Sequence, residues 1–489
     1  MAENYIKINS RDNVAVALEK LSAGETAAGV RLLSDVPAFH KFALSDIKNG
    51  EKVIKYGHAI GLSVTDIAKG EWVHTHNLKS NAQKDAVDFT PDFSLDKQIL
   101  SVQNKPPTTF KGYLRFDGRA GIRNEIWIIP TVGCVNGFCR DLAAKFSGKE
   151  VYAFTHEAGC SQCGSDQENT EKLLAGLVRH PNAGGVLIVS LGCENNVPEK
   201  FFKLTSRADE RVKLLVLQSA SDEKKEGVKL IKQLIALRKT DKKQDIPLSK
   251  LTVGLKCGGS DSMSGITANP LVGKVCDGIV SAGGGAVMGE VPEMFGAEDV
   301  LGGQCLNEEI FEKFTAMTGF FKDYFDFYKA PYGENPSPGN REGGITTIEE
   351  KSLGCVLKTG TGPVVDVVKY GGQVVKTGGV TLLYTPGNDI ASVSALAASG
   401  AQIILFTTGR GTPLGSPVPV VKIASNSLLA QRKPRWIDFD AESAVKNYGF
   451  DCAAEEMIKL IFSVLEGKRT LSEQNGCHDF AVWKNGITL

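Results

Sequence analysis

Four cysteines each stand beside a glycine-rich turn that follows a short apolar run. The runs and turns read "IWIIPTVGC", "VYAFTHEAGC", "VLIVSLGC" and "LTVGLKC", and they end at Cys134, Cys160, Cys193 and Cys257. Thiolates are soft ligands that favour zinc, iron or iron–sulfur clusters. Because only Cys160 and Cys163 have the short Cys-x-x-Cys spacing, the pattern predicts a cofactor site built from several loops rather than a zinc knuckle. The alternative is that small uncharged cysteines simply fit tight turns.

Histidines form a second group with ligand chemistry. His74 and His76 in "VHTHN" lie two residues apart, a spacing that places both imidazoles on one face of a strand. His40 in "FHKFAL" is the candidate third ligand. His156 follows an apolar run and has the intrinsic pKa of a general acid or base near neutrality. A hydrogen-bonded core histidine is the alternative reading of His156.

Polar side chains follow the same apolar runs and suit a polyhydroxylated ligand. The candidate substrate-binding residues are Arg123, Asn195, Ser260, Asp261, Asn269 and Arg410. Either arginine could pair with a carboxylate through two hydrogen bonds. The sequence has no G-x-G-x-x-G after a strand and no G-x-x-x-x-G-K-[ST], so dinucleotide binding and a P-loop are not supported.

Parallel strands must position these residues. The short apolar runs lie at 125–130, 151–156, 185–190, 213–218, 251–256, 379–385 and 401–408, with amphipathic segments at 168–179 and 225–239 among them. This alternation is typical of α/β domains with mainly parallel sheets, whose strands are buried on both faces. Ligands of such sheets bind at the carboxyl ends of the strands. We therefore expect the cysteine turns to share one functional site.

The chain divides into a small N-terminal β domain at 1–80, a linker at 81–108 and two α/β domains at 109–250 and 251–489. Within the first 80 residues D-I-x-x-G-E-x-V occurs twice, at 46–53 and 66–73. Glycine turns before β-branched residues predict hairpins. The segment 81–108 is polar and ends in "NKPPTT", which is typical of a linker.

Composition excludes several classes of function. Lys plus Arg and Asp plus Glu number 56 each, so the formal net charge is zero, and no long basic run indicates nucleic acid or an anionic membrane as a partner. No run approaches 18 apolar residues, and the polar N-terminus has no signal-peptide core. The 11 cysteines are expected to stay reduced. We expect a cytoplasmic, soluble protein that binds a small molecule, with a homo-oligomer left open.

Longer sequence motifs in the chain resemble those of the altronate/galactarate dehydratase family of sugar-acid dehydratases. They run in order from near residue 40 to beyond 420 and include "FALSDIKNGEKVIKYG", "VHTHN", "GIRNEIWIIPTVGCVN", "GCSQ", "LGCENN", "CGGSDSMSGITANP", "EVPEMFGAE", "ENPSPGN", "GGITTIEEKSLGC", "PGND" and "TGRGTP". The resemblance implies a SAF-type β-clip domain followed by two dehydratase domains. It also implies conversion of D-altronate to 2-dehydro-3-deoxy-D-gluconate and water in hexuronate breakdown, with iron as Fe²⁺, replaceable by Mn²⁺. The family motif G-C-S-Q does not require a cysteine at position 163.

Dehydration of a 2,3-dihydroxy acid needs a base for the C2 proton, a metal that stabilises the enediolate and an acid for the C3 hydroxyl. The candidate proton-transfer residues are His156, Glu194 and Lys351. Two alternatives for the iron stay open: a single ion on His40, His74 and His76, or an iron–sulfur cluster on three of Cys134, Cys160, Cys193 and Cys257.

Other functions also stay open at this point. "VHTHN" and "ENPSPGN" favour an aldonate substrate, while galactarate or another sugar acid is the alternative within the family. From other classes, a non-catalytic sugar-acid or metal-binding protein and a redox protein that uses the thiols near "GCSQCG" are the competing hypotheses.

Overall fold

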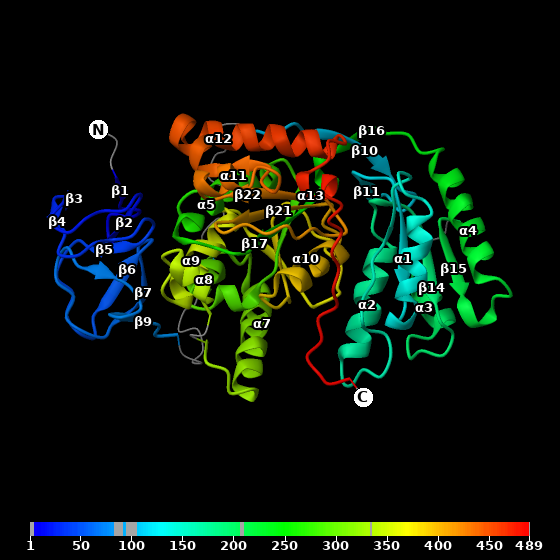
Figure 1. Ribbon diagram of the computed structural model, residues 1–489, viewed down its shortest axis with the longest axis horizontal. Coiled ribbons are helices and arrows are strands. Elements are labelled where there is room, and N and C mark those ends of the chain that lie inside the picture. Colours follow the sequence, from blue (N-terminus) through cyan, green and yellow to red (C-terminus); the bar gives the residue numbers. More distant parts are fainter. Residues whose placement is uncertain (1–3, 83–90, 94–104, 206–209, 333–334, 489) are drawn as a thin grey trace.

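Three bodies follow one another along the longest axis of the computed structural model, with the N-terminal β domain at one end, the C-terminal domain in the middle and the second domain at the other end (Figure 1). The structure describes residues 4–82, 91–93, 105–205, 210–332 and 335–488. It confirms the expected fold class, a small β domain followed by α/β units with parallel sheets. The predicted linker 81–108 lies mostly outside the described residues.

The N-terminal domain consists of short antiparallel strands. One sheet has the order β1 (Tyr5–Ile6), β2 (Val14–Ala17), β5 (Lys41–Ala43), β8 (Trp72–Val73), and another has the order β6 (Lys52–Lys55), β7 (His58–Ser63), β9 (Leu78–Lys79), beside the pair β3 (Thr26–Ala27) and β4 (Val30–Arg31). The two copies of the sequence repeat meet, because Ile47 and Ile67 form an antiparallel bridge. Both isoleucines are buried in the core.

The predicted strand through "VHTHN" is wrong. Strand β8 ends at Val73, and the next four residues form a turn before β9. Asn77 closes this turn, because its side chain accepts the N–H of His74 at 2.9 Å and donates to Trp72 O at 2.9 Å. Asparagine competes with strand hydrogen bonds in this way. His74 and His76 therefore do not lie on one strand face.

The second domain has a parallel sheet at its centre. Its order is β13 (Val151–Ala153), β12 (Glu125–Pro130), β14 (Ala183–Ser190), β15 (Val212–Val216), flanked by α1 (Asn136–Ala144), α2 (Asp166–Val178), α3 (Pro198–Thr205) and α4 (Glu223–Arg238). A small antiparallel sheet with the order β11 (Ala120–Gly121), β10 (Thr109–Leu114), β16 (Gln244–Pro247) closes the domain. Every residue of β12 and β14 is buried, as expected for a sheet covered on both faces.

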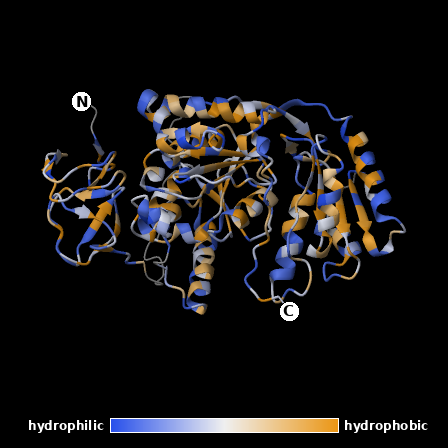
Figure 2. Cartoon of the chain, in the orientation of Figure 1, coloured by the Kyte–Doolittle hydropathy of each residue, from blue (hydrophilic) through white to orange (hydrophobic). Residues whose placement is uncertain are grey.

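The C-terminal domain holds a larger parallel sheet. Its order is β19 (Val364–Val368), β20 (Val380–Leu383), β18 (Gly285–Met288), β17 (Thr252–Cys257), β21 (Ile403–Thr408), β22 (Val420–Ala424), β23 (Phe439–Asp440). Its helices are α5 (Ala268–Ser281), α6 (Glu298–Gln304), α7 (Glu308–Phe327), α8 (Pro338–Glu342), α9 (Ile348–Val356), α10 (Asp389–Ala398), α11 (Ser427–Arg432), α12 (Ala441–Leu465) and α13 (Leu471–Gln474). Apolar residues concentrate in the strands and on the inner helix faces (Figure 2).

The C-terminal tail connects the two α/β domains. After α13 it runs between α10 and α2 (Figure 1). Ala481 N–H donates to Ser394 Oγ in the C-terminal domain at 2.9 Å, and Asp166 at the start of α2 accepts the N–H groups of Asn485 and Gly486 at 3.0 and 2.8 Å. None of the helices in the described parts of the chain has the length and apolar character needed to cross a membrane.

Candidate functional site

Charged side chains and two thiols gather at the carboxyl edge of the C-terminal sheet. We call them the charged cluster, which consists of Lys256, Cys257, Glu290, Glu293, Lys351, Cys355 and Lys358. Lys256 and Cys257 end β17, and the two glutamates follow β18. The remaining three lie on α9 or just after it. All are buried except Lys351, whose side chain is 10% exposed.

Glu290 is the centre of one half of the cluster. Its carboxylate pairs with Lys256 and accepts the Cys257 N–H at 3.0 Å. Lys256 Nζ also lies 2.7 Å from Asp389 Oδ1. The backbone of Glu290 is left-handed, with φ at +66°, a conformation that costs a non-glycine residue about 1–3 kcal/mol. Its N–H donates to Thr385 Oγ1 at 2.6 Å, so the surrounding structure holds the carboxylate in place.

The other half of the cluster depends on α9. Thr347 caps this helix by accepting the Glu350 N–H, and the i, i+4 spacing places Lys351 and Cys355 on one face. Lys351 Nζ lies 2.7 Å from Glu293 Oε1 and 2.9 Å from Asn335 Oδ1. Cys355 Sγ lies 3.4 Å from Glu293 Oε2 and 2.6 Å from Lys358 Nζ.

Pairing keeps most of these buried groups charged. Burial alone would lower the pKa of Lys256 and of Lys351, but neighbouring carboxylates raise both. Burial would likewise raise the pKa of Glu293, and the attraction of Lys351, Lys256 and Lys358 lowers it instead. The hydrogen bond between the thiols lowers the pKa of Cys257 to about 7 and, together with burial, raises that of Cys355. Perturbed acids and bases of this kind concentrate at functional sites.

Three members of the cluster could hold a metal ion. The ligand atoms of Glu290, Glu293 and Cys355 all lie within 4.8 Å of one another, and among the described residues no other set of His, Cys, Asp and Glu does so. Two carboxylate oxygens and one sulfur suit a borderline ion such as Fe²⁺. The ammonium groups of Lys256, Lys351 and Lys358 balance the negative charges here.

The structure brings the three predicted histidines together around Trp72, but their ring nitrogens do not converge on one point. His40 Nε2 lies 3.2 Å from Glu342 O, and its Nδ1 accepts the indole N–H of Trp72 at 3.2 Å. His74 Nε2 lies 3.0 Å from Arg341 O, and its Nδ1 lies 3.0 Å from Thr75 Oγ1. The His40 and His74 rings stack at 4.9 Å, and His76 packs on Trp72. Both nitrogens of His40 and of His74 are thus occupied.

The predicted four-cysteine site divides between two sheets. Cys134, Cys160 and Cys193 follow β12, β13 and β14 of the second domain, whereas Cys257 ends β17 of the C-terminal domain. The three loops of the second domain contact one another, because Gly133 N–H donates to Ala158 O at 3.1 Å and Asn196 N–H donates to Gly159 O at 3.3 Å. Cys134 and Cys193 are exposed and Cys160 is half-buried. These three thiols share an edge, and Cys257 does not.

Two other predicted residues support the turns of the second domain. Asn195 Oδ1 accepts from Cys160 Sγ at 3.2 Å and from Ser161 N–H at 2.9 Å. Glu194 accepts from Thr131 Oγ1 at 2.5 Å and from Gly192 N–H at 2.7 Å. Burial would raise the pKa of Glu194, but these hydrogen bonds lower it. The Glu194 carboxylate therefore closes its own turn, and its proton-transfer role stays a prediction.

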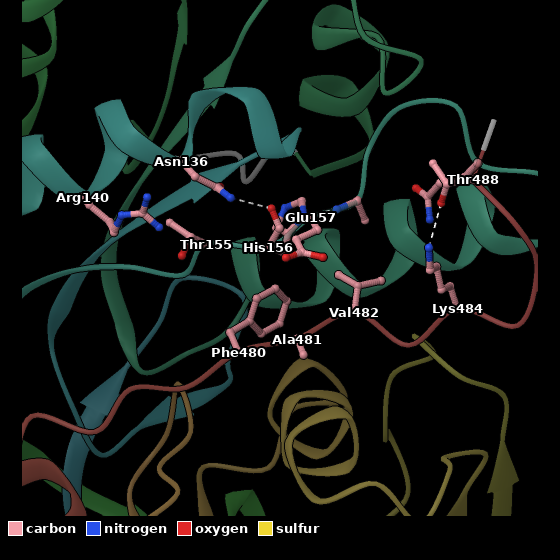
Figure 3. A pocket seen from close by; sticks show the side chains of 12 residues that line it. Asn136, Arg140, Thr155, His156, Glu157, Phe480, Ala481, Val482, Lys484 and Thr488 are labelled. Carbon is pink, nitrogen blue, oxygen red and sulfur yellow. Dashed lines mark hydrogen bonds between the residues drawn. The ribbon is translucent and has the colours of Figure 1, made fainter.

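His156 lies beside a cavity but has no free ring nitrogen. Its Nε2 lies 2.8 Å from Pro130 O, and Ala158 N–H donates to Nδ1 at 3.1 Å. Burial lowers its pKa to about 4, partly offset by the Pro130 carbonyl. The cavity, about 330 Å³, lies between the start of α1 and the C-terminal tail, with Arg140 and Phe480 in its walls (Figure 3). In this geometry both ring nitrogens of His156 contact the backbone, and its proton-transfer role stays a prediction.

The predicted substrate-binding residues occupy different places. Arg123 precedes β12, at the amino edge of its sheet, and pairs with Glu473 at 2.8 Å. Asp261 accepts from Ser425 and Asn426 at 2.7 and 2.8 Å. Both residues therefore have structural partners, and their substrate-binding roles stay predictions.

The remaining candidates lie at the carboxyl edge of the C-terminal sheet. Asn269 accepts from Thr407 Oγ1 at 2.6 Å and donates to Gly354 O at 2.8 Å, so its amide is also committed. Ser260 Oγ lies 2.7 Å from Cys257 Sγ. Arg410 is half-exposed, and its guanidinium meets Glu342 at 2.8 Å, so it is the predicted carboxylate ligand that solvent can reach.

Sequence reasoning identified Cys257 and Lys351 but missed the other members of the cluster. Those residues are Lys256, Glu290, Glu293, Cys355 and Lys358. A lysine near the end of an apolar strand, in "LTVGLKC", and the acids of "GEVPE" after "GGGAVM" were the available signals, since charges seldom lie next to buried strands without a partner. Cys355 and Lys358 follow Lys351 at helical spacing in "KSLGCVLK".

Comparison with known proteins covers the whole chain. Residues 248–488 match the family "D-galactarate/Altronate dehydratase, C-terminal", residues 112–238 match "D-galactarate dehydratase/Altronate hydrolase, second domain", and residues 3–81 match "Altronate/galactarate dehydratase SAF domain". The protein "Altronate dehydratase" of Bacillus subtilis (strain 168) is 46% identical, and the alignment covers 100% of both chains.

Two proteins of Escherichia coli (strain K12) are also similar. Its "Altronate dehydratase" is 46% identical, with 99% of this chain and 100% of the relative covered. Its "Galactarate dehydratase (L-threo-forming)" is 32% identical, with 97% and 95% covered. With its SAF domain, its two parallel sheets and full-length relatives of this kind, the chain belongs to the D-galactarate/altronate dehydratase family.

Proposed function

We propose that this protein is a hydro-lyase that converts D-altronate to 2-dehydro-3-deoxy-D-gluconate and water. The choice of altronate as the substrate rests on sequence identity. Over its full length the chain is 46% identical to two proteins named altronate dehydratase, but only 32% identical to a galactarate dehydratase. We also propose a cytoplasmic location, which the 11 cysteines support, because thiols stay reduced in the cytosol.

The charged cluster supplies two of the groups that dehydration needs, a proton donor and cations that stabilise negative charge. Lys351 Nζ keeps its proton beside Glu293 and is the most exposed cation of the cluster, so it donates the proton to the departing C3 hydroxyl. The ammonium groups of Lys256 and Lys358 stabilise negative charge that develops on the substrate, because the buried surroundings strengthen their field. Arg410 binds the substrate carboxylate.

Iron is the proposed cofactor, and the residues of the cluster fit it. Glu290, Glu293 and Cys355 would hold the ion, because their oxygen and sulfur atoms already converge. When bound, Fe²⁺ acts as a Lewis acid that makes a substrate oxygen more acidic or a better leaving group. The alternatives are a single ion on His40, His74 and His76, for which the ring nitrogens of His40 and His74 would have to leave their present partners, and an iron–sulfur cluster on Cys134, Cys160 and Cys193, whose loops contact one another.

Activity assays test the proposed reaction. Anaerobically purified, iron-loaded protein is incubated with altronate, galactarate and related sugar acids, and 2-keto-3-deoxy acid is measured. We expect product from altronate with a higher kcat/KM than from galactarate. Altronate binding without product would contradict the enzyme and leave a binding protein.

Metal analysis tests the proposed cofactor site. Iron and acid-labile sulfide are measured in the wild type, Cys355→Ser and Cys160→Ser. We expect sulfide-free iron that Cys355→Ser loses and Cys160→Ser keeps. Sulfide together with iron, lost in Cys160→Ser, would support the alternative cluster instead.

A further inference from the structure

A hairpin of the N-terminal domain inserts into the C-terminal domain behind the charged cluster. Strands β6 and β7 meet at the tip Lys55-Tyr56-Gly57. Lys55 Nζ donates to Ser262 Oγ at 2.8 Å and to Glu350 Oε1 at 2.8 Å. The tip therefore contacts the 3-10 helix Ser262–Gly265 and helix α9 at once.

Glu350 on α9 is held from two strands of the β domain. Lys41 Nζ on β5 lies 2.9 Å from Glu350 Oε2 and donates to Gly344 O at 2.9 Å. The side chains of Lys41, Lys55 and Glu350 are at most 1% exposed. Burial of three charges is costly, and their pairing offsets the cost only in a well-fitted geometry. The interface therefore tolerates little displacement of α9.

Tyr56 fixes a second point on α9. Its backbone is left-handed, with φ at +60°, and its hydroxyl lies over Gly265 and Gly354. A Cβ on Gly354 would stand 3.3 Å from Tyr56 Oη, and one on Gly265 would overlap it. The two glycines thus leave the room that the tyrosine ring fills.

The residues held by the β domain are direct neighbours of the charged cluster. Glu350 precedes Lys351, and Gly354 precedes Cys355. Gly354 O also accepts from Asn269 Nδ2, which lies 3.8 Å from Cys257 Sγ. A shift of α9 would consequently move Lys351 and Cys355 relative to Glu293, which lies on a separate element, the 3-10 helix Val291–Met294 after β18.

We propose that Lys41, Lys55 and Tyr56 of the N-terminal domain are positioning residues for the charged cluster. By holding Glu350 and Gly354 they set α9 so that Lys351 and Cys355 face Glu293. This role rests on the proposed dehydratase function for its effect on turnover. The β domain then belongs to the catalytic apparatus although none of these three side chains is assigned a contact with substrate.

The test compares full-length variants by turnover and by thiol exposure. Lys55→Met keeps the length of the side chain without its charge, and Glu350→Gln removes the shared carboxylate. We expect kcat of the folded variants to fall by about 100-fold, as displacements near 1 Å can cause, with KM little changed. Alkylation of Cys355, read by mass spectrometry, is slow in the wild type, where the thiol is buried, and fast in both variants.

A matched control separates positioning from general stability. Glu473→Gln breaks another buried ion pair, with Arg123, between the second domain and α13. It is expected to lower stability while kcat of the folded protein and protection of Cys355 stay at wild-type values. A folded Lys55→Met or Glu350→Gln protein with wild-type kcat, or with reduced kcat and Cys355 still protected, would overturn the proposal.

A milder variant covers the case in which these proteins do not fold. Gly354→Ala presses on Tyr56 Oη and on Gly265 Cα, both 3.3 Å from the new methyl group. It should lower kcat and expose Cys355, whereas Gly319→Ala in α7, with nothing within 4 Å, should do neither. If the wild type forms no product from any sugar acid, the proposed function fails, and alkylation of Cys355 alone then decides the positioning role.

Discussion

The proposed role of Lys351 as proton donor can be tested directly. Its ammonium group lies between a buried carboxylate and an amide oxygen. If Lys351 donates a proton to the leaving hydroxyl, Lys351→Met should lower kcat by roughly 10²–10⁴-fold, the usual contribution of a general acid. Steady-state kinetics on altronate measure the effect, and Lys313→Met, at an exposed i, i+4 pair on α7, is the control. Unchanged kcat in Lys351→Met would exclude the residue as the acid.

His156 gives a prediction about stability instead of turnover. Its pKa is about 4 in the folded protein because the ring is buried, whereas an unfolded histidine titrates near ~6.5. As pH falls below the unfolded value, the unfolded chain binds a proton that the folded chain does not. Stability is therefore unaffected by this group above that value and is lost as pH falls toward 4, by about 1.4 kcal/mol for each pH unit.

The variant His156→Gln isolates this effect. An amide can keep a donor toward Pro130 O and an acceptor toward Ala158 N–H but does not titrate. Urea unfolding at pH 7 and pH 5 should show a smaller loss of stability in the variant than in the wild type. At pH 7 its kcat should stay close to the wild-type value. A folded variant with kcat reduced by orders of magnitude would instead support the predicted proton-transfer role of His156.

Individual residues could be predicted only where the sequence shows their neighbours. Cys257 and Lys351 were found because one ends an apolar strand and the other lies in a distinctive word. Glu290 was missed, since its importance comes from Lys256 and Thr385, which are 34 and 95 residues away. A sequence shows that a buried charge needs a partner, and it does not show which one.

At the scale of elements, close packing between loops limits the size of side chains. The clearest case is where the loops after neighbouring strands touch. Gly159 has φ at +106°, and a Cβ there would overlap Thr131 O. Gly159→Ala should therefore destabilise the second domain by more than about 1 kcal/mol and separate the loops that carry Cys134 and Cys160. Gly137→Ala in α1, with nothing within 4 Å, should be neutral or stabilising. Thermal unfolding of both variants makes the comparison, and equal stability would contradict the packing argument.

Strands with a continuous apolar run were predicted well, whereas short strands were predicted poorly. The runs at 125–130 and 251–256 correspond to β12 and β17. "VHTHN" was predicted as a strand, but the Asn77 side chain bonds to its own backbone and ends β8 at Val73. Such local competition decides short segments, and periodicity carries no signal of it.

At the scale of the molecule, the main error of the sequence interpretation was to join two sheets into one site. Four cysteines after four strands suggested one crevice, but Cys257 belongs to a different sheet from Cys134, Cys160 and Cys193. Strand order depends on long-range packing, which local sequence does not specify. Each α/β domain has its own carboxyl edge, and the charged cluster lies on the C-terminal one.

The C-terminal tail yields a prediction at this scale. Asp166 accepts the N–H groups of Asn485 and Gly486. Asp166→Ala removes both acceptors, so amide hydrogen exchange in residues 480–488 should accelerate, whereas Asp166→Asn keeps one oxygen and should show a smaller change. Exchange followed by mass spectrometry measures both variants. Equal protection in wild type and Asp166→Ala would mean that the tail is held by its other contacts.

The docking of the β-domain hairpin against α9 also has a thermodynamic consequence. Because Lys41, Lys55 and Tyr56 belong to the same polypeptide as Glu350, insertion of the hairpin is a unimolecular equilibrium. The covalent connection gives the hairpin an effective concentration that dilution of the protein does not change. The fraction of molecules with a completed site is therefore independent of how much protein a cell makes, which a site assembled from two separately diffusing chains could not achieve.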